Sequence, residues 1–188
     1  MNLIIFGPPG AGKGTQADFI KKNFNLFQLS TGEVLRNEIK NKTELGKEIS
    51  SIIAAGSLVS DDVVKKLVEN FISNKTYEDR LIFDGYPRNL TQAKTLTELL
   101  NKYEQKINLV LKLSVSLETI KKRILERRTL EKRIDDNEEI AIKRYKTYEK
   151  STEPVIEYYK KLNLLKVIDG ERSIDQINKE ISDIISLI

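Results

Sequence analysis

Short hydrophobic runs alternate with longer amphipathic stretches along this chain. Five of these runs have the length and composition of buried strands and are bounded by turn-forming residues: 3–6, 26–29, 81–83, 109–113 and 165–168. Because the stretches between them are helix-like, the pattern predicts an α/β fold with a five-stranded parallel sheet flanked by helices. Ligands of such sheets bind beyond the carboxyl ends of the strands.

Three pairs of residues have the spacing of a capping box and mark expected helix starts. In a capping box, the side chain of the N-cap residue and that of the residue three positions later each accept a hydrogen bond from the other residue's backbone N–H. The pairs are Ser30 with Glu33, Asp136 with Glu139, and Ser173 with Gln176. The last helix then has isoleucines three or four positions apart, which predict a core-facing stripe of Ile174, Ile177, Ile181, Ile184 and Ile188. The charge-dense segment 121–133 lies between two expected helices and is a candidate mobile loop.

Composition narrows the chemistry that the chain can perform. Its 188 residues suit a single domain, and 32 Lys and Arg against 28 Asp and Glu give a formal charge of +4. With no Cys and no His, it has no thiolate nucleophile, no imidazole base and no zinc-binding cluster of the usual kind, so we expect no zinc. The modest charge and 7% aromatic residues predict no nucleic-acid partner.

The hydrophobic runs are far shorter than the roughly 18 residues that a membrane span requires. No charged-then-apolar leader precedes them. We therefore expect a cytoplasmic protein with no membrane partner.

The strongest local motif follows the first expected strand. GPPGAGKGT, residues 7–15, has the G-x-x-x-x-G-K spacing of a P-loop, with a helix expected to begin near Gly14. Glycines let backbone N–H groups surround a polyphosphate, the helix N-terminus adds positive potential, and Lys13 adds a full charge. Thr15 stands one place later than the usual hydroxyl, which disfavours GTPases and motor ATPases and favours a magnesium shell completed mainly by phosphates and water.

Two further motifs follow the second and third expected strands. FDGYPRN places Asp84 at a strand end, where an acid near a P-loop favours water-mediated magnesium binding. Arg88 follows in the same motif, and its planar guanidinium suits bidentate contact with a phosphate. STGE leads into a helical stretch that carries Arg36, and AGSLVSDD returns the chain to the core, which together predict a separate flap.

The motifs GPPGAGKGTQA, STGEVLR, GSLVSDD, DGYPRN with Gln92, and RRTLEKRIDDNEE resemble, in order, those of the adenylate kinase family. The resemblance covers nearly the whole chain and implies reversible, Mg²⁺-dependent transfer of the terminal phosphate of ATP to AMP, giving two ADP, by a monomer. It implies a core of residues 1–30, 60–127 and 136–188, a flap that binds the nucleoside monophosphate (NMP) at 31–59, and a lid of the short type at 128–135.

The resemblance also implies roles for individual residues. Catalysis would depend on Lys13, Arg88, Arg127, Arg133 and Arg144. ATP would contact Gly10, Ala11, Gly12, Lys13, Gly14, Thr15, Arg123, Arg127, Arg133 and Arg172, with Arg123 and Arg127 on one helical face. AMP would contact Thr31, Gly32, Arg36, Leu58, Val59, Gly85, Arg88, Gln92, Arg133 and Arg144. No residue would bind Mg²⁺ directly, whereas Thr15 and Asp84 would reach it through water.

Two alternatives to an adenylate kinase stay open at this point. UMP/CMP kinases resemble the chain at Pro87-Arg88-Asn89, but Thr31 and Gln92 favour adenine, whose edge pairs a donor with an acceptor as a Gln amide does. A non-catalytic nucleotide sensor or nucleic-acid module would use the P-loop but would have little use for arginines around a second phosphate pocket.

Direct transfer to an anionic phosphate acceptor needs no general base, which agrees with the absence of His and Cys.

Overall fold

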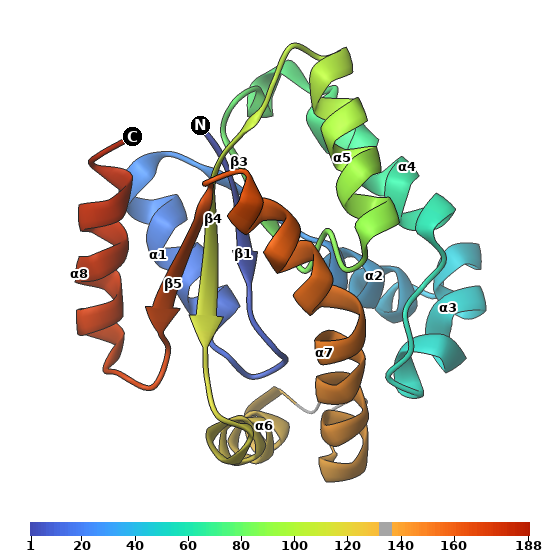
Figure 1. The fold of residues 1–188 in the computed structure, drawn as a ribbon. Coiled ribbons are helices and arrows are strands. Elements are labelled where there is room, and N and C mark those ends of the chain that lie inside the picture. Colours follow the sequence, from blue (N-terminus) through green and yellow to red (C-terminus); the bar gives the residue numbers. More distant parts are fainter. Residues whose placement is uncertain (132–136) are drawn as a thin grey trace.

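The computed structural model describes residues 1–131 and 137–188 and shows a parallel sheet between two layers of helices (Figure 1). Its strands are β1 Asn2–Phe6, β2 Phe27–Ser30, β3 Leu81–Asp84, β4 Ile107–Ser114 and β5 Leu165–Asp169. They lie in the order β2-β3-β1-β4-β5, and every pairing is parallel. The predicted α/β fold with a five-stranded parallel sheet is therefore confirmed.

Helices occupy the connections between the strands, and one more follows the last strand. They are α1 Lys13–Phe24, α2 Thr31–Lys40, α3 Glu44–Ala54, α4 Asp61–Ile72, α5 Leu90–Lys102, α6 Leu117–Glu131, α7 Glu138–Lys161 and α8 Ile174–Ile185, with a 3₁₀ turn, η1, at Lys75–Tyr77. Within the part of the chain that the structure describes, no helix combines the length and hydrophobicity needed to cross a membrane.

The alternation of side chains along the strands divides the core into two clusters. Leu3 and Ile5 of β1 point to the face covered by α1 and α8, whereas Ile4 and Phe6 point to the face covered by α4, α5 and α7. Both faces of the central strands are buried, which is why the strands are continuous hydrophobic runs in the sequence. Full burial of each such side chain stabilises the fold by about 2 kcal/mol.

Of the two predicted capping boxes that lie wholly in described residues, the one at Ser173 forms and the one at Ser30 does not. Ser173 Oγ accepts a hydrogen bond from the Gln176 backbone, and Gln176 Oε1 accepts one from Ser173 N. Ser30 makes no side-chain cap on α2. It is the last residue of β2, and its backbone conformation is determined by pairing with Asp84 of β3. The N-cap of α7 is Asn137, which accepts from Ile140 N at 2.8 Å, and the predicted cap Asp136 lies outside the described residues.

The predicted stripe on α8 is only partly correct. Ile177 and Ile181 are buried and Ile184 packs against the same cluster, but Ile174 and Ile188 are 57% and 60% exposed. Ile185 is the third buried position, because spacings of four keep side chains on the face that meets the sheet. The helix ends before Ile188, so that residue cannot continue the stripe.

The expectation of a mobile loop at 121–133 is wrong for residues 121–131, which belong to α6. Ile120 and Ile124 of α6 are buried against Ala141 of α7, and this small cluster supports the helix despite its charged sequence. Residues 132 and 133 lie outside the described part of the chain.

The capping box of α8 provides a test of local stability. We expect Ser173→Ala to lower the free energy of unfolding by about 1 kcal/mol, because it removes the acceptor for the Gln176 amide. Thermal unfolding should show a decrease in Tm of about 2–4 °C. Ser30→Ala is the matched control: it removes the same hydroxyl from an N-cap that makes no side-chain cap bond. Equal losses for the two variants would contradict this assignment.

Candidate active site

The loop between β1 and α1 turns sharply into the first turn of the helix. Gly12 is the N-cap of α1 and has φ 92° and ψ 13°, a left-handed conformation that glycine adopts without strain. Nothing lies within 4 Å of where its Cβ would be, so backbone conformation is the constraint here. Among the described residues no side chain caps α1, which leaves its first amides for an anion.

Lys13 lies at the centre of this loop. Its Nζ donates to the carbonyl oxygens of Gly7 at 2.8 Å and Pro8 at 3.1 Å, so the loop folds back over its own lysine. Burial lowers the pKa of Lys13 from 10.5 to about 8; the negative charge of Asp84 opposes this shift, and the positive charges of Arg88, Arg144 and Arg127 add to it. Three arginines from separate parts of the chain therefore act on one lysine.

Strand register brings the next two motifs to the P-loop. Asp84 at the end of β3 pairs with Ile5 of β1 on one side and Ser30 of β2 on the other. Thr31, directly after β2, consequently lies beside Gly85, and its Oγ1 donates to the Gly85 carbonyl at 3.0 Å. Asp84 is 7% exposed and accepts a hydrogen bond from Gln28 at 3.0 Å.

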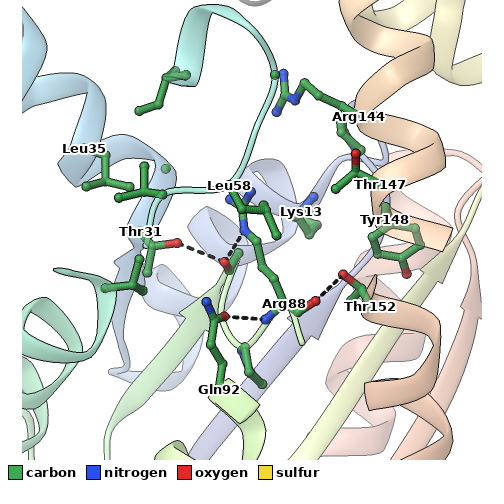
Figure 2. Close-up of a pocket in the computed structure, with 18 of the residues that line it drawn as sticks. Lys13, Thr31, Leu35, Leu58, Arg88, Gln92, Arg144, Thr147, Tyr148 and Thr152 are labelled. Carbon is green, nitrogen blue, oxygen red and sulfur yellow. Dashed lines mark hydrogen bonds between the residues drawn. The ribbon is translucent and has the colours of Figure 1, made fainter. Parts of the chain in front are cut away.

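Arg88 is held by hydrogen bonds to three neighbours (Figure 2). Its backbone N–H donates to Gln92 Oε1 at 2.7 Å, and its Nε donates to the Gly85 carbonyl at 2.7 Å. Its own carbonyl accepts from Thr152 Oγ1 of α7 at 3.0 Å. Thr152 was not among the predicted site residues, because a single Thr in a helix carries no sequence signal until the fold places it.

A cavity opens between these groups and the helices α2, α3 and α4. Every residue predicted to contact AMP lines it except Arg133, which lies outside the described residues: Thr31, Gly32, Arg36, Leu58, Val59, Gly85, Arg88, Gln92 and Arg144. Lys13 lines the same cavity, and Figure 2 shows Arg144 reaching towards it from α7. Predicted positions far apart in the sequence therefore surround one space.

Several lining residues escaped the sequence analysis. Leu35 and Ile53 form apolar parts of the wall, and both belong to helical faces whose pattern could have indicated them. Tyr148 of α7 also lines the cavity, and burial raises the pKa of its phenol, so this side chain stays a neutral hydroxyl.

Among the described residues predicted to contact ATP, Lys13 lines this cavity and the others do not; they belong to the P-loop, α6 and the turn after β5. Arg123 of α6 donates to the Gly170 carbonyl at 2.9 Å and to the Ala11 carbonyl at 3.5 Å, so it joins the P-loop to the connection after β5. Arg127 lies one helical turn further along α6. Gly10 precedes α1, and Gly14 and Thr15 are exposed in its first turn. Arg172 does not line the cavity and is paired with Glu180 and Asp169.

A strand, a P-loop and a helix, with the charges of three guanidinium groups acting on the loop lysine, are typical of P-loop phosphotransferases. Comparison with known proteins specifies the family. A family model described as adenylate kinase matches residues 5–164. The chain belongs to the adenylate kinase family.

Individual relatives agree with this assignment over their full lengths. The chain is 46% identical to the adenylate kinase of Pelagibacter ubique, with 100% of both chains covered. It is 40% identical to that of Fusobacterium nucleatum, with 98% of each covered, and 38% identical to that of Flavobacterium psychrophilum, with 99% of this chain and 98% of the relative covered. The expectation of an adenylate kinase is confirmed, and the UMP/CMP kinase alternative is not favoured.

The lowered pKa of Lys13 can be measured directly. In protein labelled with ¹³C at the lysine Cε, one resonance should titrate near pH 8, well below the ordinary lysine value of 10.5. Inorganic tripolyphosphate should raise that pKa, because an anion in the loop stabilises the charged amine. Lys13→Met identifies the resonance by its loss. A Lys13 signal that titrates near 10.5 without ligand would contradict the electrostatic description.

The same shift has a defined sign for stability. Between about pH 8 and 10.5 the unfolded chain binds the proton at residue 13 and the folded chain does not, so this group makes stability rise with pH across that window. Below about pH 8 residue 13 is protonated in both the folded and the unfolded chain, so its unfavourable contribution to the free energy of folding no longer changes with pH.

Proposed function

We propose that the chain equilibrates adenine nucleotides by moving the terminal phosphate of ATP onto AMP, with the ATP phosphates in the P-loop and AMP in the cavity beside it. The observation that carries this proposal is the meeting of Lys13, Arg88 and Arg144 at the boundary between the loop and the cavity. Two anions placed on either side of that boundary would share one group of cations.

The proposed AMP site rests on two groups of cavity-lining residues, one apolar and one cationic. Apolar side chains such as Leu35 and Val59 can enclose a base, and the buried amide of Gln92 can hydrogen-bond to it. Arg36, Arg88 and Arg144 line the same cavity and can hold the phosphate. A nucleoside monophosphate needs this combination of an apolar slot and a cationic end.

The ATP side rests on the P-loop and on α6. The uncapped amides of α1 and the charge of Lys13 suit the β- and γ-phosphates. Arg123 lies between Ala11 and Gly170, where its planar guanidinium can stack on a base, and the charge of Arg127 acts at Lys13. Arg133 lies outside the described residues, and the role proposed for it rests on the family resemblance alone.

The transfer would be direct, with the AMP phosphate oxygen attacking the γ-phosphate in line. The acceptor already carries the negative charge, so no protein nucleophile or general base is needed. The chain then contributes positioning and charge stabilisation, and Arg88 is suited to both because its backbone and Nε are fixed by neighbours. Since one phosphoanhydride is broken and another formed, the reaction should be reversible.

The donor set around the loop fits magnesium held through water and phosphates. Over the residues that the structure describes, no group of three or more acidic or other metal-binding side chains gathers. Asp84 and Thr15 offer hard oxygen atoms near the loop, as water-mediated contact requires. When bound, the ion would neutralise charge on the transferring phosphates.

The division into core, flap and lid is also a proposal. The proposed flap, 31–59, comprises α2, α3 and the loop after them, and this loop touches α7. Lys143 Nζ donates to the Ala55 carbonyl at 2.7 Å, and a Cβ on Gly56, where φ is 67°, would lie 2.9 Å from Ile140. The proposed lid, 128–135, begins in the last turn of α6, and its remainder lies outside the described residues. The monomeric state and cytoplasmic location stay predictions.

Replacement of Arg88 should separate catalysis from folding. We expect Arg88→Ala to lower kcat by about 10²–10³, because it removes a fixed donor to the transferring group. Tm should change by less than about 2 °C, since relief of repulsion with Lys13 offsets the lost bond to Gly85. Arg88→Lys should recover only part of the activity, because an ammonium cannot make the bidentate contact. Unchanged turnover in Arg88→Ala would contradict the assigned role.

The proposed function as a whole is tested by turnover of the purified chain with ATP and magnesium against AMP, CMP, UMP and GMP. We expect ADP formation from ATP and AMP, with kcat/KM for AMP at least about 10²-fold above that for the others. Coupled assay of ADP measures it. A preference for CMP or UMP, or no turnover with any acceptor, would overturn the proposal.

A further inference from the structure

Asp61 belongs to the GSLVSDD motif, but no role was predicted for it from the sequence. It is the first residue of α4 and lies at the surface, yet its Oδ1 accepts a hydrogen bond of 2.6 Å from Nε2 of the buried Gln92. Asn89 Nδ2 also donates to its two oxygens, at 3.1 and 3.3 Å. The charge of Asp61 reaches further into the site, because it adds to the effect of burial in raising the pKa of Tyr86.

The amide of Gln92 is consequently held at both ends. Its Oε1 accepts from the backbone N–H of Arg88 at 2.7 Å, and its Nε2 donates to Asp61. A backbone N–H can only donate and a carboxylate can only accept. Rotation of the amide by 180° would place two donors together at Arg88 and two acceptors together at Asp61, so the chemistry of the neighbours selects one orientation.

Held in this way, the amide still has one N–H and one lone pair for the cavity that it lines. For a base held in one position, the N–H can donate to the ring nitrogen of adenine, and the lone pair can accept from its amino group. A 6-oxopurine presents the reverse order, a ring N–H donor and a carbonyl acceptor, and would require the rotated amide.

We propose that Asp61 is a positioning residue for base selection, which orients the Gln92 amide to accept 6-aminopurine and reject 6-oxopurine monophosphates. The inference rests on the proposed function, since it requires the base of the acceptor to lie against Gln92. Asp61 acts through Gln92 and touches no substrate itself.

The test compares Asp61→Asn with the unmodified chain, using AMP and inosine monophosphate as acceptors. An Asn side chain can accept or donate, so the rotated amide no longer faces a carboxylate. We expect KM for AMP to rise about tenfold and the ratio of kcat/KM for AMP to that for inosine monophosphate to fall about tenfold. The kcat with AMP and the KM for ATP should change little. An unchanged ratio would overturn the proposal.

Asp62→Asn is the matched control, because it removes the same charge from the same helical turn. It should leave both constants for AMP unchanged; an equal effect there would show that Asp61 acts only through helix stability. In a Gln92→Ala background, Asp61→Asn should cause no further rise in KM for AMP. An additive rise in that background would contradict an action through Gln92.

Should Asp61→Asn lose its fold, Asp61→Glu keeps the charge but moves the accepting oxygens. The acceptor ratio should then also fall, and an unchanged ratio would overturn the inference. The two proposals fail differently: absence of AMP phosphorylation by the unmodified chain defeats the proposed function, whereas normal AMP turnover with unchanged selectivity in the variants defeats only the role of Asp61.

Discussion

Positive charge is concentrated around one lysine at the carboxyl ends of the strands, and this charge is the main physical constraint on the candidate site. Lys13 lies inside its own loop, and the charges of Arg88, Arg144 and Arg127 oppose its protonation. The negative charge of Asp84 favours protonation of Lys13 and so opposes the effect of the arginines. Such an arrangement costs stability in the free protein and would become favourable if polyanions entered, so the proposed phosphate site is preorganised in the folded chain.

Parallel strand register is what brings these charges together. Because β1, β2 and β3 end side by side, the three motifs that follow them meet at one level. Helix α7 then closes the far side of the cavity and supplies Arg144 and Thr152, which lie about one third of the chain beyond β3. The proposed phosphate-transfer site is thus a consequence of topology, since no single segment contains it.

Polar contacts around the proposed base pocket also join residues from separate segments. Gln92 is buried on α5, but its orientation depends on Arg88 before the helix and Asp61 on another helix. Selectivity would then be determined by neighbours that never touch the base. Thr152 supports the Arg88 backbone in a comparable way, by a hydrogen bond from α7.

The strands, the parallel sheet and the P-loop could be predicted from the sequence, because hydrophobic period and glycine spacing are local properties. Ten of the residues that line the cavity were also predicted, but the resemblance to the adenylate kinase family indicated them and neither of these patterns did. The sequence pattern predicted a loop where α6 forms, because the contact of α6 with Ala141 is non-local. It also predicted a side-chain cap at Ser30, which does not form because Ser30 pairs with β3. The hydrogen bonds between Asp61 and Gln92 and between Thr152 and Arg88 could not be predicted from the sequence and emerge from the folded chain. Those distances depend on how helices pack, and packing is a property of the whole chain.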